Sequence, residues 1–201
     1  MAPRDGRCKV NMKDISLIGF MGCGKSSVGK ILATLLPECR LIDLDTYIEE
    51  KQGKNIPEIF NEYGEAAFRR MEREALEEIF SDKSRPRAIL SLGGGTVTSE
   101  QCRQLIRQHT DCFYLRATTD TLLDNLEGHS DGRPMLNPTQ PVEAQSTETS
   151  SEREALRHRI ESLMQTRSPQ YIATAHHIID IDGLSFAQIA EAVEANILNI
   201  K

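Results

Sequence analysis

A glycine-rich stretch near the amino end contains the residue types best suited to phosphate chemistry. Residues 15–30 read ISLIGFMGCGKSSVGK, and from Gly19 onward they fit the pattern G-x-x-x-x-G-K-[ST]. In a P-loop of this pattern, glycines let successive backbone N–H groups surround the phosphates of a nucleoside triphosphate. We expect Lys25 to reach the β- and γ-phosphates and Ser26 to offer its hydroxyl to Mg²⁺. The predicted nucleotide-binding residues of this stretch are Gly22, Cys23, Gly24, Lys25, Ser26 and Ser27.

A P-loop protein can transfer the terminal phosphoryl group of its nucleotide to water or to a second substrate. Two aspartates after the next apolar run bear on this choice. Residues 40–45 read RLIDLD and predict a strand that ends with Asp43 and Asp45. Positions i and i+2 of a strand point to one face, so both carboxylates would lie at the carboxyl edge of the sheet, where open α/β sheets bind ligands. One can serve Mg²⁺ and the other can accept a proton from an attacking hydroxyl. The alternative is a pair of solvated acids in a turn.

Further polar residues follow on a predicted helix and a predicted turn. In the run FRRMERE, Arg69 and Glu72 are three positions apart and share one helix face. The run SLGGG ends a strand with Gly93, Gly94 and Gly95, which expose backbone N–H groups to a polar ligand. A helix surface laced with ion pairs and an ordinary tight turn are the competing interpretations.

Two isolated arginines are candidates for binding anionic groups. Arg133 lies in the run GRP and Arg167 in the run TRSP. The planar guanidinium matches carboxylate and phosphate groups with two parallel hydrogen bonds, although a lone arginine is most often a solvated surface charge. The histidines show no metal-binding spacing, and His176 and His177 are expected to be structural.

Strands and helices alternate along the chain. The predicted strands span residues 14–20, 40–45, 87–95, 111–117 and 176–183, and the predicted helices span 24–36, 55–82, 99–109, 119–127, 152–168 and 185–200. Asn55 can cap the long second helix with Glu58 three residues later, and Gly64 can break that helix. This order predicts an α/β fold, a three-layer sandwich in which a five-stranded parallel sheet is flanked by helices.

Two segments interrupt the alternation. Residues 128–152, GHSDGRPMLNPTQPVEAQSTETSSE, contain too few apolar residues to pack, and we expect a mobile lid there. Residues 1–12 are polar and are expected to form a disordered extension before a single domain at 13–201.

The bulk composition excludes several classes of function. A chain of 201 residues with a net charge of -6 predicts one domain that does not bind nucleic acid. The five cysteines are odd in number and show no C-x-x-C spacing, which fits a reducing cytoplasm. No apolar run is long enough to cross a membrane. Cys23, beside Lys25, is expected to be a reactive thiol that ATP protects.

Together these segments resemble the shikimate kinase family. The matching runs, in the order of the family and from about residue 15 to residue 182, are GFMGCGKSSVGK, LIDLDTYIEE, IPEIF, GEAAFRRMEREAL, LSLGGGTV, GRPML and TRSPQY. The resemblance implies a P-loop kinase that, as a monomer, transfers the γ-phosphoryl group of ATP to the 3-hydroxyl of shikimate, with Mg²⁺ as cofactor, on the route to chorismate and the aromatic amino acids.

The resemblance also implies roles for individual residues. Asp45 would contact the accepting hydroxyl, and Asp43 would complete the Mg²⁺ shell with Ser26. Arg69 and Arg167 would hold the shikimate carboxylate, with Glu72 orienting Arg69. The remaining implied residues are the catalytic Lys25, the lid arginine Arg133, which closes on the phosphates, and the backbone of Gly93, Gly94 and Gly95.

Departures from the family leave the contacts of the adenine base open. The family often has an arginine several residues before R-P-L-L, but the run DNLEGHSDGR contains no arginine before Arg133 itself. The run DIDGLSF lacks the arginine and proline that are usual there. The alternatives are another small-molecule P-loop kinase, such as gluconate kinase or a nucleoside monophosphate kinase, and a P-loop protein that binds without catalysing. A GTPase is disfavoured because no N-K-x-D motif occurs.

Overall fold

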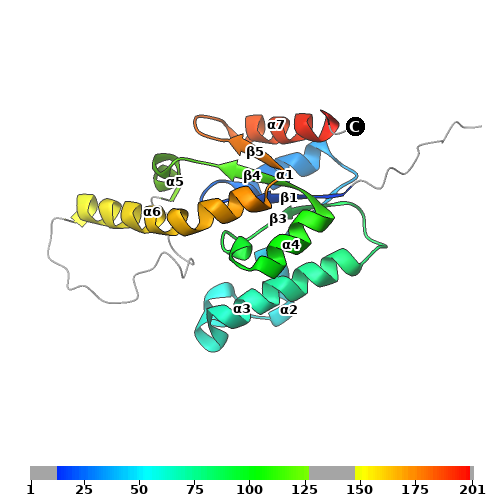
Figure 1. The fold of residues 1–201 in the computed structure, drawn as a ribbon, viewed down its shortest axis with the longest axis horizontal. Coiled ribbons are helices and arrows are strands. Elements are labelled where there is room, and N and C mark those ends of the chain that lie inside the picture. Colours follow the sequence, from blue (N-terminus) through cyan, green and yellow to red (C-terminus); the bar gives the residue numbers. More distant parts are fainter. Residues whose placement is uncertain (1–12, 127–147, 200–201) are drawn as a thin grey trace, which may run out of the picture.

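The computed structural model describes residues 13–126 and 148–199, whose strands form one parallel sheet (Figure 1). The strands are β1 (Asp14–Ile18), β2 (Arg40–Asp43), β3 (Ala88–Ser91), β4 (Thr110–Arg116) and β5 (His177–Asp180), and they lie side by side in the order β2-β3-β1-β4-β5. All four strand pairings are parallel. The predicted five-stranded parallel sheet is therefore confirmed. Because every strand runs the same way, all the carboxyl ends meet at one edge.

Helices cover both faces of this sheet. They are α1 (Lys25–Leu35), α2 (Leu44–Gln52), α3 (Ile56–Ser81), α4 (Glu100–His109), α5 (Thr119–Leu126), α6 (Glu148–Thr174) and α7 (Phe186–Asn199), with a 3₁₀ turn η1 at Thr96–Thr98. Two hydrophobic clusters lie on opposite sides of the sheet. One joins the strands to α1, α5 and α7, and the other joins them to α2, α3 and α4. The three-layer arrangement predicted from the sequence is confirmed.

Alternation along the buried strands explains how one sheet serves two cores. In β4, Phe113 and Leu115 belong to the first cluster, whereas Cys112 and Tyr114 belong to the second. All four side chains are at most 1% exposed. A strand covered on both faces needs apolar residues at every position, which is why the strands read as continuous apolar runs.

The sequence signals for α3 are confirmed in detail. Asn55 accepts a hydrogen bond from the Glu58 N–H at 2.9 Å, and the Glu58 carboxylate accepts one from the Asn55 N–H at 2.8 Å. The predicted break is present, because Gly64 has φ 76° and ψ 169° inside the helix. The first turns of α3 therefore run in a different direction from the rest.

Three expectations about boundaries need correction or fall outside the structure. β2 ends at Asp43, and α2, which the sequence analysis missed, begins at Leu44, so Asp45 belongs to a helix and not to a strand. α6 begins at Glu148, so residues 148–152 of the predicted lid are helical. The rest of that lid, with Arg133, and the extension at 1–12 lie outside the described residues.

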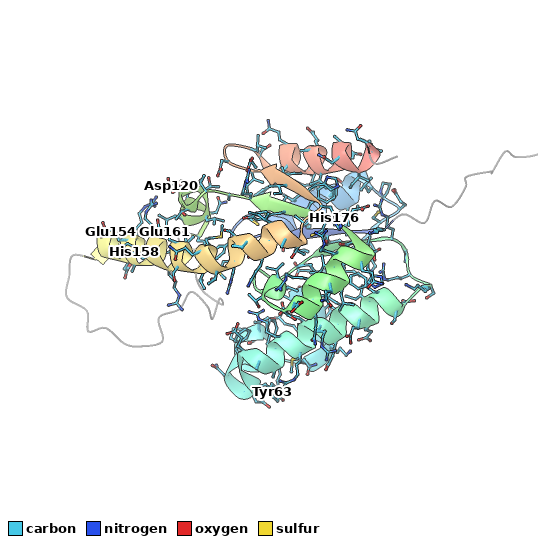
Figure 2. All side chains as sticks on the ribbon, in the orientation of Figure 1. Tyr63, Asp120, Glu154, His158, Glu161 and His176 are labelled. Atoms are coloured by element: carbon cyan, nitrogen blue, oxygen red, sulfur yellow. The ribbon has the colours of Figure 1, made fainter. Side chains whose placement is uncertain are left out.

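The two neighbouring histidines are structural, as expected. His176, labelled in Figure 2, accepts a hydrogen bond from the Cys112 N–H through Nδ1 at 3.0 Å. His177 stacks on Phe113 with ring centroids 4.7 Å apart. Both contacts attach the edge strand β5 to β4. No helix in the described part of the chain is both long and apolar enough to cross a lipid bilayer.

Candidate active site

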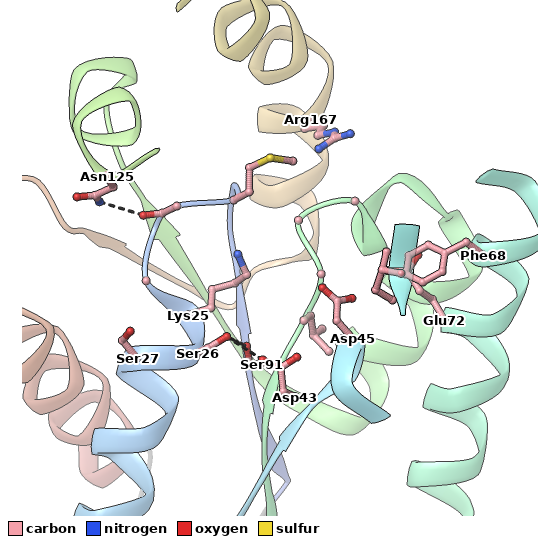
Figure 3. Close-up of a pocket in the computed structure, with 18 of the residues that line it drawn as sticks. Lys25, Ser26, Ser27, Asp43, Asp45, Phe68, Glu72, Ser91, Asn125 and Arg167 are labelled. Atoms are coloured by element: carbon pink, nitrogen blue, oxygen red, sulfur yellow. Dashed lines mark hydrogen bonds between the residues drawn. The ribbon is translucent and has the colours of Figure 1, made fainter. Parts of the chain in front are cut away.

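A cavity of about 600 Å³ opens at the carboxyl edge of the sheet (Figure 3). It brings together residues that are more than 160 positions apart in the sequence, from Met21 to Phe186. The predicted site residues among its walls are Gly22, Gly24, Lys25, Ser26, Ser27, Asp43, Asp45, Arg69, Gly93, Gly94, Gly95 and Arg167.

The P-loop connects β1 to α1 and forms one wall of the cavity. Gly24 sits at the N-cap of α1 with φ 84°, a conformation that a residue with a Cβ adopts only with strain. Lys25 is 8% exposed and donates hydrogen bonds to the carbonyl oxygens of Gly19 and Phe20, both at 3.0 Å. The ammonium group therefore lies at the base of the loop, beside the positive end of the α1 dipole.

Ser26 and Asp43 form a pair of oxygen groups next to this loop. The Ser26 hydroxyl donates to the Asp43 carboxylate at 2.7 Å and lies 3.2 Å from the Ser91 hydroxyl. Asp43 also caps α2, since its other carboxylate oxygen accepts a hydrogen bond from the Thr46 N–H at 3.4 Å. The cap and the parallel pairing of β2 with β3 hold the carboxylate at the sheet edge.

Asp45 projects into the cavity from the first turn of α2 (Figure 3). The expectation that it shares a strand face with Asp43 was wrong, yet both carboxylates line the same cavity. Burial raises the pKa of Asp45 to about 6, with the Glu72 and Asp43 carboxylates adding to the rise and Lys25 opposing it. A carboxyl group with this pKa is a better proton acceptor near neutral pH than an ordinary aspartate.

Arg69 is held by two carboxylates on its own helix. Its Nη1 lies 2.7 Å from Glu72 Oε2, and its Nη2 lies 3.0 Å from Glu65 Oε1. Glu72 is fully buried, and its second oxygen accepts a hydrogen bond from the Thr96 hydroxyl at 2.5 Å. A Cβ at Gly95 would overlap the guanidinium, so only glycine lets Arg69 reach this position. The predicted pairing of Arg69 with Glu72 is confirmed.

Arg167 enters the cavity from α6, and its positive charge has a different environment from that of Arg69. It is 4% exposed, and among the described residues no carboxylate lies within 4.0 Å of it. Its Nη1 is buried without a hydrogen-bond partner there, and the same holds for Arg69 Nε. Two guanidinium groups on the same cavity thus keep unused donors, and burying an unpaired donor is costly unless a ligand satisfies it.

The Cys23 thiol lacks the accessibility that its predicted reactivity requires. Its side chain is fully buried in the hydrophobic cluster under the P-loop and is not among the residues that line the cavity. The Cys23 N–H donates to the Phe20 carbonyl at 3.2 Å, which shapes the turn of the loop. The Lys25 ammonium lies 3.7 Å from the thiol, as expected, but a buried thiol is shielded from reagents, so the predicted reactivity stays a prediction that this burial argues against.

Several cavity residues were not found by sequence reasoning. Phe60 and Phe68 of α3 contribute apolar surface near Arg69, with ring centroids 4.8 Å apart. Asn125 of α5 donates to the Gly22 carbonyl at 2.9 Å, and the Phe186 ring of α7 lies against Gly24. These residues have no motif of their own, and only the packing of α5 and α7 beside the loop places the last two.

A P-loop, two carboxylates and two arginines on one α/β cavity define an ATP-dependent kinase that phosphorylates small molecules. Comparison with known proteins gives the family. The family model described as shikimate kinase matches residues 21–197. The shikimate kinase of Thermus thermophilus is 35% identical over 179 residues, which cover 89% of this chain and 86% of that protein. The shikimate kinase of Chlorobaculum tepidum is 37% identical over 187 residues, 91% of each chain.

Solved structures agree with the sequence comparison. A structure of shikimate kinase from Acinetobacter baumannii in complex with shikimate is 30% identical, with a TM-score of 0.78, and the match covers 94% of this chain and 95% of that one. Shikimate kinase from Bacteroides thetaiotaomicron is 28% identical, also with a TM-score of 0.78, over 93% and 99% of the two chains. This chain belongs to the shikimate kinase family.

Proposed function

We propose that this protein transfers the γ-phosphoryl group of ATP to the 3-hydroxyl of shikimate, which yields shikimate 3-phosphate and ADP. The observation that carries the proposal is the pair of arginines. Arg69 and Arg167 come from different helices, line one cavity and keep buried guanidinium nitrogens without a partner among the described residues. A carboxylic acid as the phosphoryl acceptor would satisfy them, whereas an acceptor without an acidic group would not.

The acceptor half of the reaction is assigned to residues on α2, α3, α6 and the glycine turn after β3. Arg69 and Arg167 bind the acceptor carboxylate, and the backbone at 93–95 lies against the ring hydroxyls. Asp45 accepts the proton of the attacking hydroxyl, a role supported by its pKa of about 6. Phe60 and Phe68 exclude water from the side of the acceptor ring.

The nucleotide half of the reaction is assigned to the P-loop. The backbone from Gly22 to Ser27 surrounds the phosphates, and Lys25 neutralises the charge that develops as the γ-phosphoryl group moves. We assign Arg133 to the same task, as a cation that approaches the phosphates from the lid, although it lies outside the described residues. Little covalent chemistry is needed, since positioning and charge neutralisation lower most of the barrier.

The residues present fit a magnesium ion bound together with the nucleotide. Ser26 and Asp43 offer a hydroxyl and a carboxylate oxygen 2.7 Å apart beside the P-loop, and Mg²⁺ prefers oxygen ligands shared between protein, phosphate and water. No cluster of three acidic, histidine or cysteine side chains that could form a dedicated metal site exists in the described ranges. When bound, Mg²⁺ would neutralise phosphate charge during transfer. A monomeric state and a cytoplasmic location remain predictions.

An acceptor screen tests the proposal. The purified protein is incubated with ATP, Mg²⁺ and one acceptor, and ADP release is followed with a coupled assay. We expect rapid turnover with shikimate and little with gluconate, nucleoside monophosphates or the methyl ester of shikimate, which keeps every hydroxyl but lacks the carboxylate charge. Equal rates with shikimate and its methyl ester would contradict the assignment of the two arginines. Faster turnover with gluconate would identify a different acceptor.

A further inference from the structure

We propose that Tyr171 is a positioning residue for the acceptor half of the cavity, because its hydroxyl holds the glycine turn after β3 and its side chain lies one helical turn from Arg167. The inference deepens the proposed function and rests on it. Tyr171 lies on α6, is fully buried and does not line the cavity, so it acts through its neighbours and not on a ligand directly.

The first contact joins α6 to the glycine turn. The Tyr171 hydroxyl donates a hydrogen bond to the Gly94 carbonyl at 2.5 Å, across 77 positions of sequence. Glycine has little conformational preference of its own, so a run of three glycines needs external contacts to hold one orientation. This hydrogen bond supplies such a contact at the middle glycine.

The orientation of the carbonyl sets the orientation of the following amide. In a planar trans peptide, the C=O of Gly94 and the N–H of Gly95 point in opposite directions, and the described chain contains no cis peptide. The carbonyl is turned toward α6, so the Gly95 N–H is turned away from it. In the described ranges neither Gly94 nor Gly95 uses its N–H for a hydrogen bond within the protein, and both residues line the cavity. Tyr171 thereby keeps the Gly95 N–H turned away from α6, where a ligand in the cavity can accept from it.

The second contact is with Arg167, one helical turn earlier on α6. Residues i and i+4 lie on the same helix face, so the guanidinium and the phenol ring are neighbours. Burial raises the pKa of Tyr171, and the nearby positive charge of Arg167 opposes this rise. The hydroxyl therefore stays protonated at neutral pH and can donate its hydrogen bond to the Gly94 carbonyl.

The ring itself is fixed by stacking on β4. Tyr171 and Tyr114 have centroids 4.9 Å apart and an interplanar angle of 20°. Tyr114 is 1% exposed, and it provides a matched control because removing its hydroxyl changes the same stacked pair without touching the glycine turn. A purely structural role for the stack predicts the same behaviour for both tyrosines.

Kinetics of Tyr171→Phe and Tyr114→Phe separate positioning from packing. Loss of a hydrogen bond to a buried carbonyl corresponds to about a five- to fiftyfold effect on the state that depends on it. We expect KM for shikimate to rise by about that factor in Tyr171→Phe, with KM for ATP within about twofold of the wild type. Tyr114→Phe should leave both constants near the wild-type values. Parallel changes in both variants, or equal changes in the two KM values of Tyr171→Phe, would overturn the proposal.

A measurement on the free protein keeps this test separate from the proposed function. In spectra of protein labelled with ¹⁵N-glycine, the amide signals of Gly94 and Gly95 should shift or broaden in Tyr171→Phe and remain in place in Tyr114→Phe. Unchanged signals in Tyr171→Phe would refute the positioning role even if shikimate is the acceptor. Changed signals would support it even if the acceptor proves to be another carboxylic acid.

Discussion

The two arginines of the cavity differ in how their charge is balanced. Arg69 has Glu72 and Glu65 as partners, whereas Arg167 has no carboxylate partner in the described part of the chain. The charge of Arg69 is therefore balanced within the protein whether or not a ligand is present. We expect Arg167 to take its counter-charge from a bound ligand. Substitution should separate these two situations.

Replacing Arg167 with lysine should mainly weaken acceptor binding. Lysine keeps the charge but loses the planar pair of donors, so we expect KM for shikimate to rise by about 10- to 100-fold while KM for ATP changes little. Arg69→Lys should show a similar rise and also a lower melting temperature, because the buried Glu72 loses a donor. Arg70, exposed on the same helix, provides the control Arg70→Lys, which should match the wild type. Equal losses for shikimate and ATP would point to misfolding instead.

The pH dependence of the reaction should follow Asp45. In the proposed role Asp45 accepts a proton, so it would work only when ionised, and its pKa is raised to about 6. The value of kcat/KM for shikimate should be level near pH 8 and fall about tenfold per pH unit below pH 6. A profile that stays level down to pH 4.5 would exclude Asp45 as the base.

Removing the negative charge of Asp45 while keeping its shape gives a second test of the same residue. Asp45→Asn should bind ATP with nearly wild-type affinity, because the side chain lies in the part of the cavity that we assign to the acceptor. The loss of a general base should lower kcat by about 10²- to 10⁴-fold. Nucleotide affinity is measured by calorimetry and kcat by the coupled assay. Turnover within about tenfold of the wild type would not be compatible with a base.

At the scale of single elements, α3 is bent at Gly64 so that one helix serves two walls. Ile56 and Phe60 precede the bend, Arg69 follows it, and all three line the cavity. A straight helix would repeat every 3.6 residues and could not change direction between these groups. Gly64 is therefore needed for its backbone conformation and not for close packing, since nothing lies within 4 Å of where its Cβ would be.

Gly64→Ala should cost more stability than Gly53→Ala. Both sites are sterically open, but Gly64 has φ 76° and ψ 169°, a region reserved for glycine, whereas Gly53 has φ 65° and ψ 23° at the end of α2. We expect a loss of about 2–3 kcal/mol at Gly64 and about 1 kcal/mol at Gly53. Urea unfolding measures both. Equal losses would mean that alanine is no more strained in the backbone conformation of Gly64 than in that of Gly53.

Elements with strong local signals were predictable from the sequence. The capping box at Asn55 and Glu58 located the start of α3, and the apolar runs located the strands. α2 was missed because RLIDLD continues the apolar alternation of β2 through Leu44, although Asp43 at the N-cap and Gly53 after the last turn are helix signals. The two motif carboxylates were assigned to the correct cavity for an incorrect local reason.

Long-range packing explains what sequence reasoning could not place. Nothing around Phe186 or Asn125 marks them as neighbours of the P-loop, because their positions follow from where α7 and α5 dock. The burial of Cys23 is likewise decided by the turn of the loop, which directs the thiol into the core. Motifs therefore identified the groups that do chemistry, and tertiary contacts supply the walls around them.

At the scale of the whole molecule, the first and last helices support each other. α1 and α7 pack in one cluster on the same face of the sheet, and Ile189 of α7 is 1% exposed (Figure 1). α1 carries Lys25 and Ser26, so the position of the nucleotide site depends on a helix that begins about 160 residues later. We therefore expect α7 to unfold together with the rest of the domain and not on its own.

Truncating a buried residue of α7 tests this coupling. Ile189→Ala should lower the free energy of unfolding by about 2–4 kcal/mol, because it leaves a cavity in the cluster shared with α1. Leu198, 53% exposed on the same helix, provides the control Leu198→Ala, which should change stability by less than about 0.5 kcal/mol. Unfolding is followed by circular dichroism in urea. Similar effects of the two substitutions would show that α7 is not docked in this way.

The strand order has a consequence for how the chain is made. β1 comes first along the chain among the described strands and is the central strand of the sheet, yet Ile15 pairs with Ile89 on one side and with Asp111 on the other. While the intervening residues are translated, this apolar strand has neither of these two partners, which leaves its backbone edges exposed to other contacts. Of the strands that the structure describes, the one that leads into the P-loop therefore waits longest for its first partner, and we expect its folding to respond to the pace of translation.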